Sequence, residues 1–264
     1  MTIDPSAVIH PSAVIAPGAR IGGGCQIGPF CVVDAEVTLH ERVELKSHVV
    51  VTGLTEIGAG TQIFPFACLG EVPQDLKFRG EKTRLIIGAD NRIRENVTMN
   101  TGTEGGGGVT RVGDGGLFMA NSHVAHDCQI GNRVILANNV AIAGHCVLED
   151  EVIVGGLSGV HQFVRIGHGA MIGAVTMVTA DVIPHGLVQG PRGVLDGLNL
   201  VGLKRRGADR GDLHALRELL GDLGAGSFRD NARARADEGT DNAYVREVLD
   251  FILGPSDRPF LTPR

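Results

Sequence analysis

Three histidines in the second half of the chain have spacings that would bring them together in a regularly coiled fold. His126, His145 and His161 are separated by 19 and 16 residues. In a stack with about 18 residues per turn they share one face, on successive turns roughly 4.8 Å apart. Asp127 follows the first histidine, and Gly144 lies one turn beyond it. Imidazoles beside a carboxylate suit either proton transfer or zinc binding.

Two chemistries compete for this cluster. In the first, His126 is a general base that takes a proton from a substrate hydroxyl, while Asp127 orients it and stabilises the imidazolium. The backbone N–H of Gly144 would then stabilise a developing oxyanion. In the second, several histidines bind zinc and leave a position open for water, as in a zinc-dependent enzyme such as a γ-class carbonic anhydrase. The spacing alone leaves both open, and a bound-metal assay would separate them.

The coil that aligns these residues is predicted by an apolar residue that recurs every six positions. A period of six fits neither a helix nor a hairpin, but it suits short strands joined by sharp bends. Such a repeat buries its apolar face only by stacking on copies of itself, which predicts a parallel β-helix. The recurring residues are Ile3, Ile9, Ile15, Ile21, Ile27, Val33, Leu39, Leu45, Val51, Ile57, Ile63 and Leu69, then Val112, Phe118, Val124, Ile130, Leu136, Ile142, Leu148, Val154, Val160, Ile166, Ile172 and Val178.

Two breaks in the repeat and a change of pattern near the C-terminus define the domain organisation. We expect a β-helix over residues 1–190, with external loops near 71–84 and 103–109. The first break preserves the phase of the repeat, and the second shifts it by one residue. Residues 191–264 are expected to form a linker and a helical domain that covers the last coil. Its predicted helices are Asp209–Leu223, Phe228–Asp237 and Thr240–Leu253, with Thr240 as the N-cap of the last.

Composition narrows the function classes. The chain has 39 glycines, no Trp and one Tyr, as a narrow column filled with aliphatic residues requires. A net charge of −6 argues against nucleic-acid binding. The N-terminus lacks a basic segment, and no apolar run is long enough to span a membrane, so we expect a cytoplasmic protein. Cys25, Cys31, Cys128 and Cys146 occupy small inward positions of the hexad, which favours reduced core residues.

Several motifs resemble one enzyme family over nearly the whole chain up to about residue 210. The stretch Asn-Ser-His-Val-Ala-His-Asp-Cys at 121–128, Ala143-Gly144-His145 and Val160-His161-Gln162-Phe163 are similar to acyl-[acyl-carrier-protein]–UDP-N-acetylglucosamine O-acyltransferases. These enzymes catalyse the first step of lipid A biosynthesis. Further similar segments are Ile27–Phe30, Lys46–Val50, the loop Gly70–Lys77, Asn91–Glu95 and Gly202–Gly207.

The resemblance implies a left-handed parallel β-helix, assembled as a homotrimer with active sites between adjacent subunits. It also implies transfer of a 3-hydroxyacyl group from acyl carrier protein to the glucosamine 3-position of UDP-N-acetylglucosamine. His126 matches the family's general base, Asp127 its partner and Gly144 the oxyanion donor. No metal or organic cofactor is implied, because the acyl group arrives on the phosphopantetheine of the carrier protein as an activated thioester.

The same resemblance assigns substrate contacts. The positions that match contacts to the nucleotide sugar or the acyl-pantetheine are Gln74, Asp75, His123, His145, His161 and Gln162. Asn199, Arg205 and Arg206 match positions toward the nucleotide phosphate and the carrier protein, and a basic cluster suits an acidic carrier. Ala174 matches the position where acyl-chain length is selected. We expect it to admit a medium-to-long 3-hydroxyacyl chain, somewhat shorter than glycine would.

Two departures from the family pattern concern the acceptor. The chain has Asn100-Thr101 where many members have His-Arg, and Val201 where an acidic residue is common. Some relatives acylate a 3-amino analogue of the sugar, and this analogue is therefore an alternative acceptor. A carrier-binding β-helix without enzymatic activity is a further alternative, and it predicts no acyl transfer with any donor and acceptor.

Overall fold

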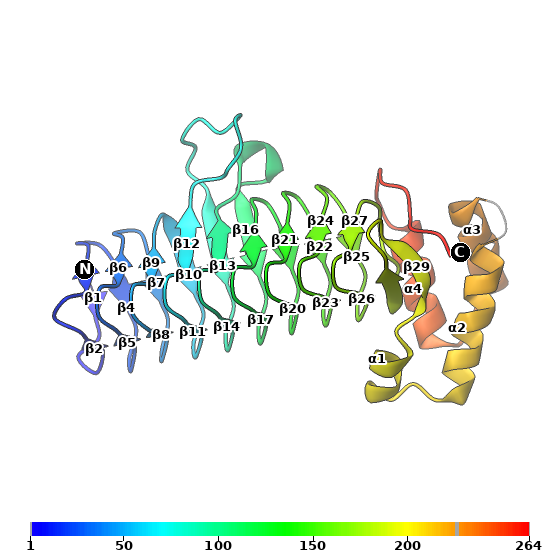
Figure 1. The fold of residues 1–264 in the computed structure, drawn as a ribbon, viewed down its shortest axis with the longest axis horizontal. Helices are drawn as coiled ribbons and strands as arrows, with labels where there is room; N and C mark the ends of the chain where they lie inside the picture. The colour runs from blue at the N-terminus through cyan, green and yellow to red at the C-terminus, as the bar shows by residue number, and fades with distance from the viewer. Residues whose placement is uncertain (1, 225–226, 264) are drawn as a thin grey trace.

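The computed structural model describes residues 2–224 and 227–263 as a column of parallel strands that ends in a group of helices (Figure 1). Three sheets form the walls of the column. The first sheet contains β1 (Thr2–Ile3), β4 (Arg20–Ile21), β7 (Thr38–Leu39), β10 (Leu54–Ile57), β13 (Arg84–Ile87), β16 (Val109–Val112), β19 (Gln129–Ile130), β22 (Val147–Leu148) and β25 (Arg165–Ile166).

The second and third sheets follow the same order along the column. The second contains β2 (Val8–Ile9), β5 (Gln26–Ile27), β8 (Glu44–Leu45), β11 (Gln62–Ile63), β14 (Arg92–Ile93), β17 (Leu117–Phe118), β20 (Ile135–Leu136), β23 (Ile153–Val154), β26 (Met171–Ile172), β28 (Gly186–Gln189) and β29 (Val194–Leu198). The third contains β3 (Val14–Ile15), β6 (Val32–Val33), β9 (Val50–Val51), β12 (Cys68–Glu71), β15 (Thr98–Asn100), β18 (His123–Val124), β21 (Ala141–Ile142), β24 (Gly159–Val160) and β27 (Met177–Val178).

The hexad explains which side chains fill the column. Along most of the column, each two-residue strand buries its second residue, the recurring apolar one, and turns its first residue outward. Cys25, Cys31, Cys128 and Cys146 are buried and unpaired, as their inward positions predict. Strand pairing of Ile3 with Ile21 shows that one coil contains three hexads. The predicted fold class, a parallel β-helix of hexapeptide repeats with a small C-terminal α domain, is confirmed.

Both breaks in the repeat are loops on an intact stack. Ile57 pairs with Ile87 although the coil between them carries the segment 72–83, and Ile87 pairs with Val112 around a second loop. The second loop includes the 3₁₀ turn η1 (Glu104–Gly106). Figure 1 shows the two loops projecting side by side from the same part of the column. Loop residues that do not belong to the hexad repeat can therefore contact the strands that follow.

The C-terminal part closes the column. β29 pairs antiparallel with β28, and four helices follow: α1 (Leu200–Arg205), α2 (Arg210–Leu223), α3 (Phe228–Glu238) and α4 (Ala243–Leu253). The predicted helices match α2 to α4, but the expected cap of the last was wrong. Asn242 caps α4 by accepting from the Val245 N–H at 3.0 Å, because its side chain stands directly before the first turn. The domain boundary at 190/191 stays a prediction.

Within the described ranges, no helix is both long and apolar enough to cross a membrane.

Candidate functional site

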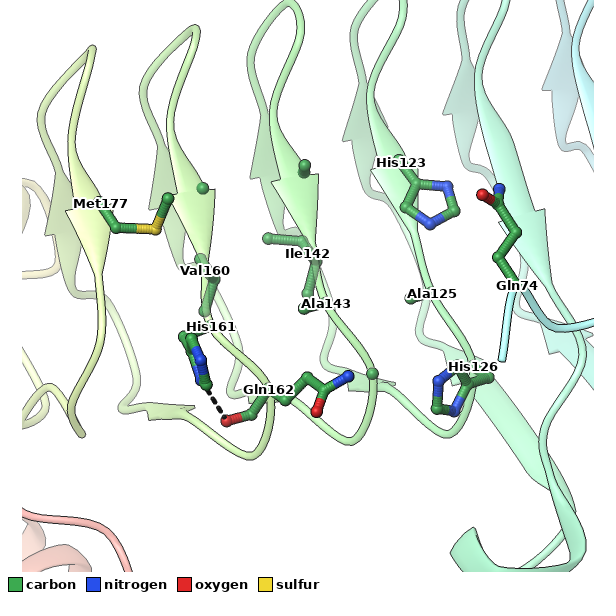
Figure 2. Close-up of a pocket in the computed structure, with 13 residues that line it drawn as sticks. Gln74, His123, Ala125, His126, Ile142, Ala143, Val160, His161, Gln162 and Met177 are labelled. Atoms are coloured by element: carbon green, nitrogen blue, oxygen red, sulfur yellow. Dashed lines mark hydrogen bonds between the residues drawn. The ribbon is translucent and has the colours of Figure 1, made fainter. Parts of the chain in front are cut away.

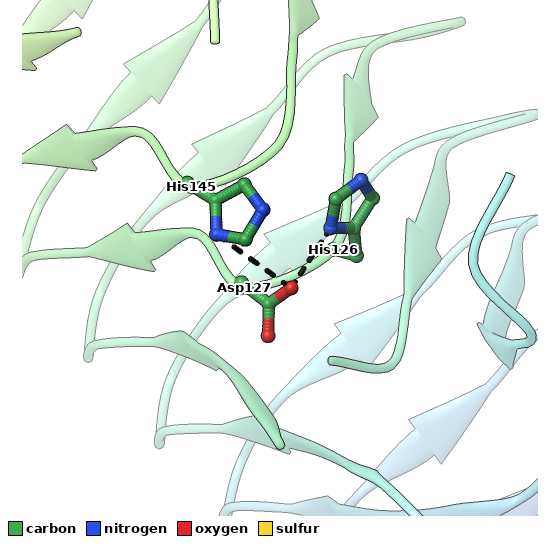
Figure 3. A group of neighbouring side chains, drawn as sticks. All are labelled: His126, Asp127 and His145. Atoms are coloured by element: carbon green, nitrogen blue, oxygen red, sulfur yellow. Dashed lines mark hydrogen bonds and ion pairs between the residues drawn. The ribbon is translucent and has the colours of Figure 1, made fainter. Parts of the chain in front are cut away.

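A buried histidine–carboxylate pair lies at the corner that follows β18. His126 Nδ1 is 2.8 Å from Asp127 Oδ2, and the two residues are 6 % and 4 % exposed (Figure 3). Asp127 has a φ of 60°, a left-handed conformation that Asp tolerates better than most residues. The bend turns the carboxylate back onto the imidazole that precedes it. Because Nδ1 is engaged by Asp127, Nε2 is the nitrogen left for a substrate.

The second loop holds the Asp127 carboxylate in place. Thr103 donates its backbone N–H to Oδ1 at 2.8 Å and its hydroxyl to Oδ2 at 2.6 Å. The Asp127 N–H donates to Thr110 Oγ1 at 2.7 Å. A carboxylate held by several donors keeps its orientation toward His126. Sequence reasoning missed both threonines.

The glycines of this loop have a steric reason. A Cβ on Gly106 would stand 2.1 Å from Asp127 Cγ, and one on Gly102 would stand 2.8 Å from Oδ1. Only a backbone without side chains can close over the carboxylate at these points. The one-residue phase shift and the glycine run were visible in the sequence, and they were the signal that marked this loop. Their connection with Asp127 was not.

Gly144 lies against the His126 imidazole, one coil later. A Cβ at this position would stand 2.5 Å from His126 Cε1 and 2.6 Å from Nε2. Within the described part of the chain, the Gly144 N–H makes no hydrogen bond. This free N–H lies beside the His126 ring, the candidate base. It is suitably placed to donate a hydrogen bond to negative charge that develops there during a reaction.

His126 opens onto a cavity of about 640 Å³ (Figure 2). His123, Ala141, Gly159 and Met177 form one side of it, because strand pairing places them in one row on the third sheet. The two small residues make a trough between the larger ends of the row. The remaining lining residues are Gln74, Ala125, Ile142, Ala143, Gly144, Val160, His161 and Gln162. The cavity thus joins an apolar trough to a polar edge.

Burial lowers the pKa of two further histidines of the site, which favours their neutral form. Burial lowers the pKa of His123, whose Nδ1 is hydrogen-bonded to Thr98 Oγ1 at 2.7 Å. Burial also lowers the pKa of His145, against the opposing effect of Asp127. His145 packs edge-on to His126, with ring centroids 4.9 Å apart, and stacks on Phe163 at 4.4 Å. It lines a neighbouring hollow of about 490 Å³ rather than the cavity itself.

The three histidines of the sequence prediction therefore meet, but they do not all face one space. His126 and His161 line the cavity, and His145 supports the pair from the other side of the corner. Among the residues that line the hollow beside His145 is Arg258, from the end of the chain. Its guanidinium is 2.7 Å from His161 Nδ1. No repeat or motif pointed to this arginine.

Besides Asp127 and His145, five predicted site residues do not line the cavity of a single protomer. Asp75 accepts from the Lys77 N–H at 2.9 Å within the first loop, and Ala174 is exposed at the corner between β26 and β27. Asn199 caps α1 by accepting from the Gly202 N–H at 3.0 Å. Arg205 is exposed at the end of α1, and Arg206 donates to His185 Nδ1 at 3.0 Å in a separate hollow.

The donor set at His126 does not suit zinc. The ligand atoms of His126, Asp127 and His145 lie within 4.8 Å of one another, so geometry alone would allow an ion. Both Asp127 oxygens, however, already accept hydrogen bonds from Thr103. The Nδ1 atoms of the two histidines approach the same oxygen, at 2.8 and 3.8 Å. This is the arrangement of a carboxylate that orients the His126 imidazole as a hydrogen-bond donor.

Comparisons with known proteins agree with the repeat and identify a family. A family model described as bacterial transferase hexapeptide (six repeats) matches residues 18–53 and 110–144. A second, described as UDP N-acetylglucosamine O-acyltransferase, domain 2, matches residues 181–261.

Curated relatives match most of the chain. An acyl-[acyl-carrier-protein]–UDP-N-acetylglucosamine O-acyltransferase of Paracoccus denitrificans is 81 % identical over 201 residues, which cover 76 % of this chain and 77 % of that protein. The protein with the same name from Agrobacterium fabrum is 47 % identical over 265 residues, covering 99 % and 98 %.

Solved structures share the fold from end to end. The UDP-N-acetylglucosamine acyltransferase from Campylobacter jejuni superposes with a TM-score of 0.90 at 36 % identity, over 97 % of this chain and 100 % of that one. An enzyme from Francisella novicida with the same description gives a TM-score of 0.87 at 34 % identity, over 99 % and 94 %. On these matches the chain belongs to the acyl-[acyl-carrier-protein]–UDP-N-acetylglucosamine O-acyltransferase family.

Proposed function

We propose that this chain transfers a 3-hydroxyacyl group from the thioester of acyl carrier protein to the glucosamine 3-position of UDP-N-acetylglucosamine, the first step of lipid A biosynthesis. The observation that carries the proposal is the His126–Asp127 pair at the edge of the cavity, with Gly144 against its ring. The names of the relatives support the choice of donor and acceptor.

The reaction follows from the positions of these groups. His126 Nε2 takes the proton of the sugar 3-hydroxyl as its oxygen attacks the thioester carbonyl, and Asp127 stabilises the imidazolium that forms. The Gly144 N–H donates to the oxyanion of the tetrahedral intermediate. When the intermediate collapses, the C–S bond breaks and the pantetheine thiolate takes the proton from His126. Release of the ester and of the free thiol returns the enzyme to its starting state.

The thioester supplies the activation, so the reaction proposed here uses no metal or organic cofactor. A zinc-dependent alternative, such as a γ-class carbonic anhydrase, is disfavoured by the committed oxygens of Asp127. Chelator treatment separates the two mechanisms. The rate of acyl transfer should be unchanged after exhaustive treatment with a chelator, and loss of activity that returns with zinc would overturn the acid–base mechanism.

A homotrimer would complete the site. Asn199, Arg205 and Arg206 lie away from the cavity of their own protomer. We propose that these three residues of one copy contact the nucleotide phosphate bound at the cavity of a neighbouring copy. From β17 to β26 the outward residues of the second sheet are apolar and half-buried, namely Leu117, Ile135, Ile153 and Met171. At the corner next to that sheet Leu157 is 65 % exposed and Val175 60 %. These faces would be covered in a symmetric assembly. Sedimentation at micromolar concentration tests this, and a monomer would contradict it.

The acyl chain is proposed to lie along the trough of the third sheet. Met177 closes the end of the trough away from His123, and a Cβ on Gly159 would stand 3.1 Å from its Cε. Ala174 stays a prediction for chain-length selection, although it lies outside this cavity in the single protomer. Together they favour a medium-to-long chain over the longest donors.

One experiment tests reaction, acceptor and chain length. Purified protein is incubated with 3-hydroxyacyl carrier proteins of graded length and with UDP-N-acetylglucosamine or its 3-amino analogue, and the products are identified by mass. The expected product is the 3-O-ester. If the only product were the amide of the 3-amino sugar, that sugar would be the acceptor in place of UDP-N-acetylglucosamine. Absence of transfer in every combination would overturn the proposal in favour of a carrier-binding β-helix.

A further inference from the structure

The end of the chain returns to the β-helix as a strap, residues 254–261, that reaches the edge of the cavity. It follows α4 and pairs with the last coil, where Phe260 bridges to Asp181. The Asp181 N–H donates to Pro259 O, and the Leu261 N–H donates to Asp181 O, both at 2.8 Å. The strap is therefore attached by backbone hydrogen bonds on both sides of its bridge.

A buried ion pair strengthens this attachment. Asp181 is 0 % exposed, and its carboxylate accepts from Arg165 Nε at 2.9 Å and from Ser256 Oγ at 2.7 Å. The Arg165 guanidinium in turn stacks over the Phe251 ring at 4.4 Å. Ser256 Oγ also accepts from the Arg258 N–H at 3.1 Å. Because these contacts join the strap to the coil and to α4, the backbone at Arg258 has a defined place.

From this place Arg258 reaches the polar edge of the cavity. Its Nη2 is 2.7 Å from His161 Nδ1 and also donates to Gln162 O. Its Nη1 contacts Thr179 O at 3.4 Å. His161 and Gln162 both line the cavity, whereas Arg258 lies behind them in the hollow shared with His145. Arg258 therefore touches two lining residues without lining the cavity itself.

The chemistry of the contact determines the state of His161. His161 Nδ1 lies 2.7 Å from Arg258 Nη2 and 3.3 Å from Gln162 O. A guanidinium has donors only and stays charged, so in the shorter of these two contacts Nδ1 acts as the acceptor. The ring proton is then on Nε2, the one nitrogen that remains for a ligand. A histidine in this tautomer offers an N–H to an acceptor group, such as an oxygen of a nucleotide sugar. Without Arg258 the ring could turn or exchange its tautomer.

We propose that Arg258 is a positioning residue for the acceptor substrate, which acts by holding His161 as an Nε2–H donor and by fixing the Gln162 backbone beside it. This inference rests on the proposed function for the identity of the substrate, a nucleoside diphosphate sugar. It assigns a part in substrate binding to a segment that is distant in sequence from the two lining residues it contacts, at separations of 97 and 96 residues.

A double-mutant cycle tests the proposal. Arg258→Met, His161→Ala and the double variant are compared by KM for UDP-N-acetylglucosamine and by kcat. Arg258→Met should raise KM about tenfold, with a smaller effect on kcat. The reason is that a His161 ring no longer held in place loses a ground-state contact to the sugar nucleotide, of the order of one charge-assisted hydrogen bond. If Arg258 acts through His161, the double variant should be little worse than His161→Ala. Multiplication of the two effects would overturn the proposal.

Two further variants separate positioning from folding. Arg258→Lys keeps a cationic donor and should recover part of the lost affinity, which a role in holding the strap alone would not require. Arg246→Met removes an exposed arginine of α4 that donates to Thr240 O at 2.8 Å, and it should leave KM and kcat unchanged. A lower melting temperature in Arg258→Met with unchanged KM would show that the strap is only structural.

Binding measurements keep this inference separate from the proposed reaction. If the wild-type protein transfers no acyl group, the proposed function fails, and calorimetric titration of the same variants with UDP-N-acetylglucosamine still tests Arg258. Weaker binding by Arg258→Met than by wild type, and equal binding by the double variant and His161→Ala, would support the positioning role. Equal affinity of Arg258→Met and wild type would overturn it.

Discussion

Two clusters in this molecule have the same composition and different surroundings. Each contains two histidines and one carboxylate whose ligand atoms lie within 4.8 Å: one is built on His126, Asp127 and His145, the other on His168, His185 and Glu247. All three residues of the first cluster belong to corners of the β-helix, beside the cavity. The second joins the last coils to α4, because Glu247 comes from that helix.

In the second cluster every histidine nitrogen faces a charged group, and His168 Nε2 lies 3.8 Å from Glu151 Oε2. His168 Nδ1 donates to Glu247 Oε1 at 2.6 Å, and His185 Nε2 donates to Oε2 at 2.9 Å. The other nitrogen of His185 accepts from Arg206, and this histidine is 0 % exposed. A zinc ion would have to displace these donors and approach a guanidinium. The cluster is therefore a latch between the β-helix and the helical domain.

The electrostatics of the latch follow from these contacts. Burial by itself would raise the pKa of Glu247, but hydrogen bonds from His168 and His185 outweigh it and lower the pKa to about 2. The hydrogen bond to Glu247 raises the pKa of the half-buried His168, whereas burial lowers the pKa of the enclosed His185. In the first cluster His126 Nε2 instead faces the cavity. Two imidazoles and a carboxylate thus form a latch in one place and the proposed catalytic group in the other, according to what surrounds them.

The largest expected difference between the clusters is in turnover. His126→Ala should lower kcat by about 10²–10⁴-fold, because it removes the general base, while leaving the assembly and the melting temperature nearly unchanged. His168→Ala is the matched control and should retain turnover. Steady-state kinetics and sedimentation measure both. A near wild-type rate in His126→Ala would refute the mechanism, and with it the contrast between the clusters.

The next effect concerns the backbone beside His126. Gly144→Ala places a methyl group where the imidazole now lies, so the ring must move and kcat should fall by about 10²-fold. Gly221→Ala in α2 is the control, since no atom lies within 4 Å of its Cβ, and a slight gain in stability is expected. Equal activity of the two variants would show that Gly144 does not fix the ring.

In the latch, removal of charge should affect stability rather than turnover. Glu247→Gln leaves His168 and the buried His185 without their charged acceptor, which should cost about 1–3 kcal/mol of unfolding free energy. We expect the low end of this range, because the Glu247 side chain is 35 % exposed and partly screened by solvent. Chemical denaturation measures the loss, and Glu218→Gln on the exposed face of α2 is the control. Loss of kcat with unchanged stability would assign the second cluster to the reaction.

The smallest effect is the pH dependence of the latch. The folded-state pKa of Glu247 is lower than its ordinary value, so its contribution to stability is fully present above about pH 4.5 and is lost as the pH falls toward 2. For His168 the pKa is raised, so its contribution is present below pH 6.5 and is lost as the pH rises through the folded-state value. The gap in unfolding free energy between wild type and Glu247→Gln should narrow in acid. A constant gap from pH 5 to 3 would contradict this origin.

The repeat made much of the site predictable. Because one coil contains three hexads, the positions of His126 and Gly144 follow from arithmetic once the repeat is recognised, and the structure places them in contact. The row from His123 to Met177 is predictable for the same reason. The orientation of a side chain at a corner is not: His145 turns to the far side of the bend, where it stacks on Phe163.

By itself the sequence determined the column, its inward residues and the alignment of groups one coil apart, since local periodicity and burial decide these together. Only the tertiary structure decided which segments outside the repeat reach the aligned groups. Thr103 holds Asp127 from a loop, Arg258 holds His161 from the strap, and Glu247 joins two histidines from α4. Loops and tails have no period that relates their sequence to a place on the column, so their contacts depend on where the folded chain carries them.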